Sequence, residues 1–290
     1  MKQTQFFIIF FIICFSFLGC GATKQAYITK DSNVIDTAKY KCVYQFKFLE
    51  DSINMKYKDN DLYVIQIGEN FTKSYCYQLF YFDSINNIPR RGAKDGMGEY
   101  IVTNYPADGI ITPAFQEGLY KFTTGYWQFY VFKDYIKEKI TVTEQISAYH
   151  FMYDDELKPQ DWIIMKDTMT ILEYSCQKAI CSFRDRNWVA WFTSEIPISE
   201  GPYKFCGLPG LILKLEDAES HFSFEINNFQ KVNEPIHMYI DKYSRKMDRI
   251  SFLKLKMNRT GTDLTAMDGA KVGLVISNEK QHDHIERDYK

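Results

Sequence analysis

The sequence predicts a mainly β protein built on a large antiparallel, curved sheet, either a half-barrel or two layers, with one or two short helices. Two observations predict this class. Aromatic residues make up 17% of the chain, including 23 Phe and 21 Tyr, and such residues favour the pleated, half-buried surfaces of strands. Apolar and polar residues also alternate along several segments, which is the period-two pattern of a strand with one buried face.

The N-terminal residues predict export. An apolar run over residues 6–15 follows Lys2 and reaches Leu18, as in a signal peptide, and it is shorter than the roughly twenty residues that span a bilayer. Leu18-Gly19-Cys20 resembles the lipobox of bacterial lipoproteins, in which the cysteine is lipidated. Phe17 departs from that pattern, and cleavage after Ala22 is the alternative. We expect a protein of the cell envelope, anchored through lipidated Cys20 or otherwise periplasmic.

The chain divides by composition into four parts. We expect a signal peptide over residues 1–20, a flexible polar spacer over 21–39, one β-rich domain over 40–260 and a polar, partly disordered tail over 261–290. The formal net charge of -2 gives no global attraction to nucleic acid or to anionic membrane. We therefore expect no nucleic-acid partner, and a membrane contact only through the lipid anchor.

Strand patterns begin after the spacer. Residues 40–49 alternate strictly, and further runs at 62–67, 127–133, 139–143 and 149–153 complete an antiparallel meander. Residues 85–118, rich in Pro and Gly, are expected to form loops. Ile250, Leu253 and Met257 recur at helical spacing and predict a short amphipathic helix capped by Asp248. Its basic face is expected to be solvated, and contact with a partner or anionic lipid is the alternative.

Two hairpins are predicted in the central part of the domain. Residues 176–184 and 187–193 form the first, with Asp185-Arg186 as its turn, and Trp188 is expected to pack in the core rather than to hold a ligand. Pro209-Gly210 fits a type II turn that reverses the chain. A second hairpin follows over residues 211–226 and turns at 217–220.

This central part carries a resemblance to a known family. Gly207, Leu208, Pro209, Gly210, Leu211 and Ile212 form the hexapeptide that names the GLPGLI family of exported bacterial proteins. Residues 188–193, 195–198 and 201–205 also resemble the flanking pattern of that family, whereas Asp185 and Cys206 replace glycines that are usual there. The resemblance implies export, a β-rich domain and an architectural role for the hexapeptide; the family has no assigned activity, cofactor or catalytic residues, so none is carried over to this chain.

The cysteines of the domain are odd in number, so at least one thiol is free. They are Cys42, Cys76, Cys176, Cys181 and Cys206. We expect buried, inert thiols, and Cys176 and Cys181 point to opposite faces of a regular strand and so cannot bridge each other. The pairing of the others stays open.

No catalytic or nucleotide-binding motif occurs in the sequence. Three weaker arrangements remain: a Cys206 and His221 pair for thiol catalysis, an acidic turn at Asp154, Asp155 and Glu156 that is expected to be solvated rather than to bind Ca²⁺, and a weak metal pair at His282 and His284. The function that we predict is a non-enzymatic envelope binding or accessory protein without cofactors. Its partner would be an unknown envelope protein. The alternatives are a periplasmic carrier of a lipid or other apolar ligand, and a thiol-dependent enzyme.

Overall fold

A computed structural model describes residues 33–51, 56–77, 129–146, 149–238, 240, 244–257 and 285–288. The predicted signal peptide with Cys20, the predicted loop region 85–118, and the pair of His282 and His284 lie outside these ranges. The described elements are β1 (Asn33–Asp51), β2 (Lys56–Ile67), β3 (Phe71–Cys76), β4 (Phe129–Asp134), β5 (Lys139–Ile146), β6 (Tyr149–Glu156), β7 (Ile163–Ile171), β8 (Tyr174–Phe183), β9 (Arg186–Thr193), β10 (Leu211–Asp217), β11 (Phe222–Met238), β12 (Arg245–Lys246) and α3 (Arg249–Met257).

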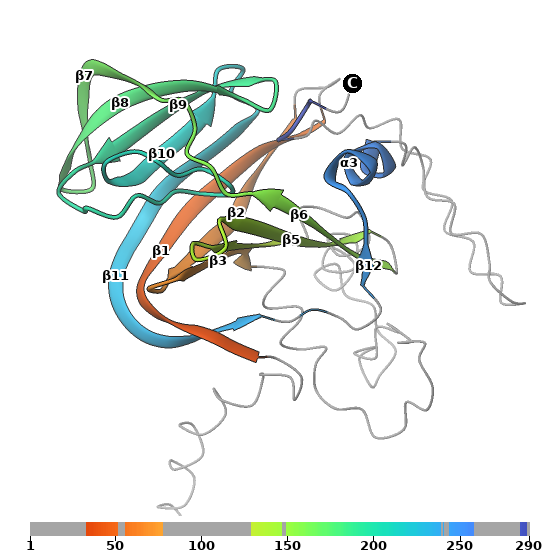
Figure 1. Cartoon of the computed structure of the whole chain (residues 1–290). Helices are drawn as coiled ribbons and strands as arrows, with labels where there is room; N and C mark the ends of the chain where they lie inside the picture. Colours follow the sequence, from red (N-terminus) through yellow and green to blue (C-terminus); the bar gives the residue numbers. More distant parts are fainter. Residues whose placement is uncertain are drawn as a thin grey trace, which may run out of the picture.

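The strands form one open, curved sheet, so the predicted mainly β class is confirmed (Figure 1). Its strand order is β12-β6-β5-β4-β3-β2-β1-β11-β10-β9-β8-β7, and every pair is antiparallel except β12 with β6. The long central strands β1 and β11 bend strongly, and three register shifts interrupt their pairing. Bulges of this kind bend and twist a strand, which accounts for the curvature of the sheet.

The interior is built from the alternation that the sequence predicts. Tyr44, Phe46 and Phe48 of β1 are buried, and Phe46 stacks on Phe224 of β11 with ring centroids 4.3 Å apart. Such aromatic pairs contribute about 0.5–1.5 kcal/mol beyond the area that they bury. β1 begins at Asn33, so the predicted spacer overlaps a paired strand at residues 33–39.

The connection between β9 and β10, residues 194–210, packs inside the curved sheet. Tyr203 contacts Phe129 of β4 with ring centroids 5.6 Å apart, and Phe205 contacts Trp188 of β9 at 4.8 Å. Since β4 and β9 lie far apart in the strand order, this connection spans the interior between them. Trp188 is a core residue, as predicted, with 1% of its surface exposed.

Both predicted hairpins are present, with one correction. The turn between β8 and β9 is Arg184-Asp185, one residue earlier than predicted, and both residues have positive φ angles, 56° and 58°. This geometry is the type I′ turn that fits the twist of a hairpin. Arg186 is therefore a strand residue with a buried side chain.

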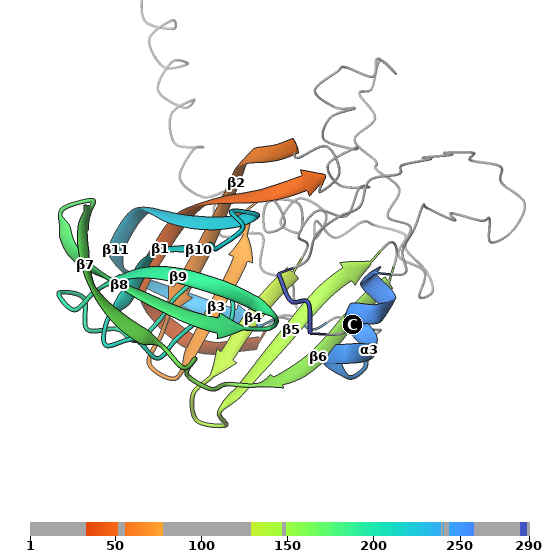
Figure 2. The same cartoon turned by 90° about the horizontal axis from the view of Figure 1, so that it is seen from above.

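The predicted amphipathic helix is confirmed as α3. A carboxylate oxygen of Asp248 accepts a hydrogen bond from the backbone N–H of Ser251 at 2.9 Å, which is the N-cap contact. Phe252 and Leu253 are buried against the sheet, and Figure 2 shows α3 beside β6. Among the helices that the structure describes, none has the length and apolar character to cross a membrane.

Candidate functional site

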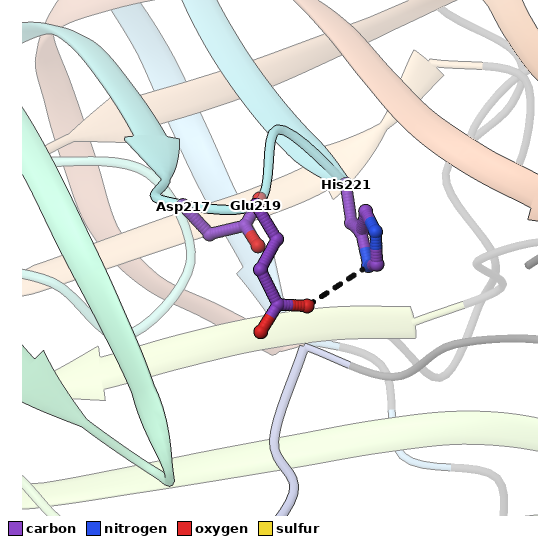
Figure 3. A group of neighbouring side chains, drawn as sticks. All are labelled: Asp217, Glu219 and His221. Atoms are coloured by element: carbon purple, nitrogen blue, oxygen red, sulfur yellow. Dashed lines mark ion pairs between the residues drawn. The ribbon is translucent and has the colours of Figure 1, made fainter. Parts of the chain in front are cut away.

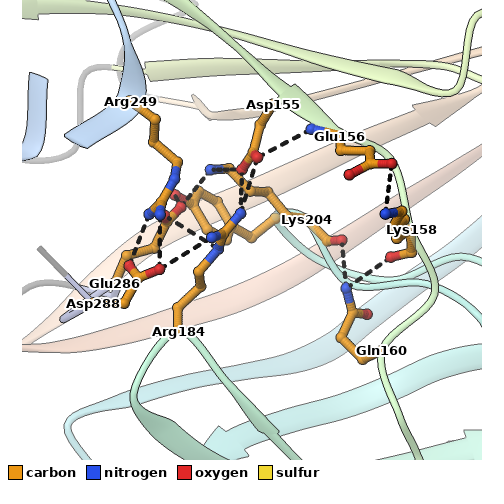
Figure 4. Close-up of polar contacts among 10 residues, drawn as sticks. Asp155, Glu156, Lys158, Gln160, Arg184, Lys204, Arg249, Glu286 and Asp288 are labelled. Atoms are coloured by element: carbon orange, nitrogen blue, oxygen red, sulfur yellow. Dashed lines mark hydrogen bonds and ion pairs between the residues drawn. The ribbon is translucent and has the colours of Figure 1, made fainter. Parts of the chain in front are cut away.

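An ion-pair cluster closes the seam between the two ends of the curved sheet (Figure 4). The end of β6, the β8–β9 turn, the connection 194–210, the start of α3 and the C-terminal segment, residues 285–288, all contribute to it. Its charged members are Asp155, Arg184, Lys204, Arg249, Glu286 and Asp288.

Glu286 is the buried anion at the centre of this cluster, and its side chain has no exposed surface. It accepts hydrogen bonds from the ammonium of Lys204, from the hydroxyl of Tyr203 and, at 2.6 Å, from Arg249. Burial alone would raise the pKa of Glu286, but the charge of Lys204 and these hydrogen bonds hold it below its ordinary value. Glu286 is therefore ionised at neutral pH, which an unpaired buried carboxyl group would not be.

Asp155 joins the two ends of the sheet directly. It accepts hydrogen bonds from Arg184 at 2.8 and 2.9 Å and from Lys204 at 2.9 Å. Burial would raise its pKa, and the charges of Lys204 and Arg184 lower it. The expectation of a solvated acidic turn is therefore wrong for Asp155, because partners that are distant in the sequence bury and pair it.

Asp288 completes the cluster at its solvent side. Arg249 donates to both of its carboxylate oxygens at 2.7 Å, and Arg184 donates to one of them at 3.0 Å. The cluster thus has three cations and three carboxylates, and its formal charge is zero. Such mutual neutralisation is typical of a structural network, whereas a catalytic acid or base is kept partly unpaired with its pKa near the working pH.

A second buried ion pair holds the same connection from its other side. Lys133 of β4 donates to Glu200, to the carbonyl of Phe205 at 2.8 Å and to the carbonyl of Gly201 at 3.2 Å. The other oxygen of Glu200 accepts from the hydroxyl of Tyr135. All three ammonium protons of Lys133 have acceptors, so this group anchors the connection.

Asp217, Glu219 and His221 lie at the β10–β11 turn, with potential metal-ligand atoms within 4.8 Å of one another (Figure 3). The carboxylates are already paired with cations. Asp217 accepts from Arg186 at 2.7 Å, and Glu219 forms an ion pair with Arg287 at 2.7 Å. A metal ion would have to displace both arginines, so the geometry favours an ion-paired turn.

A small cavity lies beside the ion-pair cluster, between α3 and the sheet. Its volume is about 20 Å³, enough for one water molecule. Tyr153, Tyr203 and Glu286 line one side, and Phe252 and Lys256 of α3 line the other. It is too small for a lipid or a metabolite.

The hexapeptide residues form a bend and the start of β10. Gly207 has a φ of +95° and lies against Pro159. Gly210 does not have a positive φ, so the predicted type II turn is wrong; instead, its N–H donates to the carbonyl of Leu208 at 2.8 Å, as in a γ-turn. Leu208, Leu211 and Ile212 are core residues. These contacts are architectural.

Cys206 and His221 lie beyond opposite ends of β10. Cys206 precedes the strand and His221 follows it, and its seven residues correspond to about 20 Å of extended chain. The neighbours of Cys206 are Lys158 and Gln160, whereas His221 contacts Glu219 and Arg287. Burial raises the pKa of the Cys206 thiol, and the nearby Lys133 only partly offsets this. The reactive thiolate is therefore a minor form at neutral pH.

The described cysteines are all free and buried, as expected for inert thiols. The ion-pair cluster, by contrast, was not predicted. Lys204 carried a weak signal, because it is a lone charge between Tyr203 and Phe205 in an apolar stretch. Glu286 and Asp288 carried none, and they lie in the tail that the sequence predicted to be partly disordered.

The fold and the site define an open, curved β-sheet protein with an ion-pair cluster of zero formal charge at its seam. A family model described as "Protein of unknown function (Porph_ging)" matches residues 183–214. This match covers the β8–β9 turn, β9, the connection 194–210 and the first half of β10. No curated protein matches the chain.

Two solved structures of PNGF-II, in space groups P21 and C2, are distantly similar in fold. Their TM-scores are 0.48 and 0.46, each at 13% sequence identity. The similarity covers 78% of this chain and 34% of the PNGF-II chain. This chain therefore matches about a third of PNGF-II, and a similarity at this level supports no statement about activity.

Proposed function

We propose that the chain is an exported protein of the GLPGLI type that acts in the bacterial cell envelope as a non-enzymatic binding or accessory module. The observation that carries the proposal is the sheet edge at β7, which is the last strand in the order of the described strands. An exposed edge strand offers a row of backbone donors and acceptors to an extended segment of another protein.

The side chains of β7 support binding through this edge. Ile163 is 62% exposed, Ile164 46% and Met169 37%, and Leu172 in the following turn is 51% exposed. Apolar side chains thus project beside the backbone groups that an added strand would pair with. The occupant that we propose is an extended apolar segment of an envelope protein, added as a strand next to β7.

One feature limits where such a strand can pair. The register of β7 with β8 shifts between Ile164 and Thr168, and Lys166 lies in this bulge. Bulges and edge lysines are devices that discourage uncontrolled pairing of edges. We therefore place the pairing segment at residues 168–171, where β7 is regular.

A photo-crosslinking amino acid at position 169 tests the proposal in envelopes of the source bacterium. We expect it to crosslink a discrete protein, and we expect substitution of Leu172, the exposed residue directly after the pairing segment, by Lys in the same chain to reduce that product at least tenfold without changing the urea midpoint of unfolding. The matched control is Leu255→Lys, which changes an exposed leucine on α3, and this helix packs against β6 near the opposite end of the strand order from β7. Equal crosslinking in all three chains would refute binding at this edge.

The cavity of about 20 Å³ beside α3 does not support the carrier alternative, and among the described residues the connection 194–210 packs between β4 and β9. The thiol-dependent enzyme lacks an accessible thiolate among the described cysteines. Lipid anchoring at Cys20 remains part of the proposal. We expect mass spectrometry of the mature N-terminus to find a diacylglycerol adduct on Cys20, and an unmodified N-terminus after Ala22 would contradict it.

A further inference from the structure

The C-terminal segment, residues 285–288, occupies a cationic pocket that the rest of the chain builds. Arg184, Lys204 and Arg249 supply three positive charges, and Asp155 supplies one negative charge. Without Glu286 and Asp288 the pocket would carry a formal charge of +2, and with them it carries zero. Two carboxylates therefore match the pocket in charge.

The donors are arranged for two carboxylates at alternate positions of an extended segment. Tyr203, Lys204 and Arg249 converge on Glu286, while Arg249 and Arg184 converge on Asp288. The intervening backbone is held too, because the N–H of Arg287 donates to the carbonyl of Arg184 at 3.0 Å. Ile285 is buried with 3% of its surface exposed. The buried apolar side chain and the two bound carboxylates are held as a short peptide motif is held by its receptor.

The receptor part is also held by contacts that do not involve the C-terminal segment. Lys204 is fixed between Tyr203 and Tyr153, and its ammonium lies 5.3 and 4.9 Å from their ring centroids. Asp155 pairs with both Lys204 and Arg184. Arg249 is placed by the helix that Asp248 caps. Elements from four parts of the chain thus hold the cations in place.

Resting on the binding role proposed above, we propose that this pocket is a receptor for acidic peptide segments of the form apolar-acidic-x-acidic. The chain's own residues 285–288 are its resident ligand, and an acidic segment of a partner takes their place. The ligand class follows from the two carboxylate positions, the buried apolar position before them and the paired backbone N–H.

The test uses the full-length chain and a labelled synthetic peptide that comprises residues 281–290. We expect the Glu286→Gln, Asp288→Asn variant to bind this peptide at least tenfold more tightly than the wild-type chain does, by fluorescence anisotropy, because its resident ligand is weakened. The same peptide with Gln at position 286 and Asn at position 288 should bind at least tenfold more weakly. The matched control is Asp154→Asn with Glu156→Gln, which removes the same charge outside the pocket and should behave as the wild type does.

A second measurement keeps the test decisive if the double variant does not fold. In the wild-type chain, an excess of the unsubstituted peptide should accelerate hydrogen exchange at the Arg287 amide at least fivefold, and the peptide with the Glu286→Gln and Asp288→Asn replacements should not. Equal binding of the two peptides, or an unchanged Arg287 exchange rate at saturating peptide, would overturn the receptor. Because this experiment needs no envelope partner, its failure would leave strand addition at β7 unaffected.

Discussion

Gly210 is required by the closeness of another backbone rather than by its own φ angle. A Cβ atom at this position would lie 2.0 Å from the carbonyl oxygen of Thr193 and 2.6 Å from its carbonyl carbon. Backbone atoms cannot move aside as a side chain can, so any larger residue must shift β9 or the start of β10. The glycine of the hexapeptide is thus explained by packing.

We expect Gly210→Ala to lower the free energy of unfolding by about 3 kcal/mol, at the upper end of the cost of overpacking. Gly201→Ala is the matched comparison, since its Cβ would lie 2.6 Å from the Cδ1 atom of Ile212, the mobile end of a side chain, and should cost about 1 kcal/mol. Urea unfolding followed by tryptophan fluorescence measures both. Equal stability of the two variants would show that the backbone at Thr193 shifts at little cost.

At the scale of elements, the C-terminal segment makes the stability of the fold depend on pH. The pKa values of Asp155, Glu286 and Asp288 are all lowered in the folded protein, by cationic partners that outweigh burial. A carboxyl group with a lowered folded pKa stabilises the fold above its unfolded pKa, about 4, and this contribution is lost as the pH falls through the folded value. Acid should therefore release the segment.

We expect Glu286→Gln to lower the free energy of unfolding at pH 7 by about 2 kcal/mol, less than the roughly 3–5 kcal/mol typical of breaking a buried pair, because Asp155 still neutralises Lys204. The difference from the wild type should shrink as the pH falls below about 4, where Glu286 is protonated first in the unfolded chain and then, at its lowered pKa, in the folded protein. Urea midpoints between pH 7 and pH 3 measure this. A constant difference over the whole range would mean that Glu286 does not titrate with folding.

Elements that are set by neighbouring residues in the sequence could be predicted. Features that are set by contacts with residues far away in the sequence could not. The alternation in β9, β10 and β11 and the Asp248 cap of α3 are read from neighbouring residues. The β8–β9 turn was predicted one residue late because Arg186 pairs with Asp217 in the interior, which no local feature indicates. Asp155 reads as part of a solvated acidic run, and its partners Arg184 and Lys204 lie 29 and 49 residues away. The candidate site was missed for this reason.

At the scale of the whole molecule, the ion-pair cluster connects the two ends of the sheet, which are not joined by strand pairing in the described part of the chain. The sheet is open in strand order, with β12 at one edge and β7 at the other. Asp155, next to the β12 edge, contacts Arg184, next to the β7 edge, so polar contacts join the two ends of the sheet. Lys133 and Glu200 hold the enclosed connection against β4. Opening the seam should therefore expose the interior as a unit.

The reactivity of the cysteines measures the opening of this interior, because they are distributed over β1, β3, β8 and the connection 194–210. Burial raises the pKa of Cys181 to about 12 and raises that of Cys42 and Cys206 as well. We expect Cys42, Cys76 and Cys206 to react with a thiol probe at pH 8 only at the urea concentration that unfolds the protein. Cys176, which pairs with Met169 of the edge strand β7, should react at lower urea through local opening. Peptide mapping by mass spectrometry resolves the individual sites. Labelling of Cys206 in native buffer at the rate of an unfolded peptide would show an open seam and would favour the thiol-dependent enzyme over the non-enzymatic module.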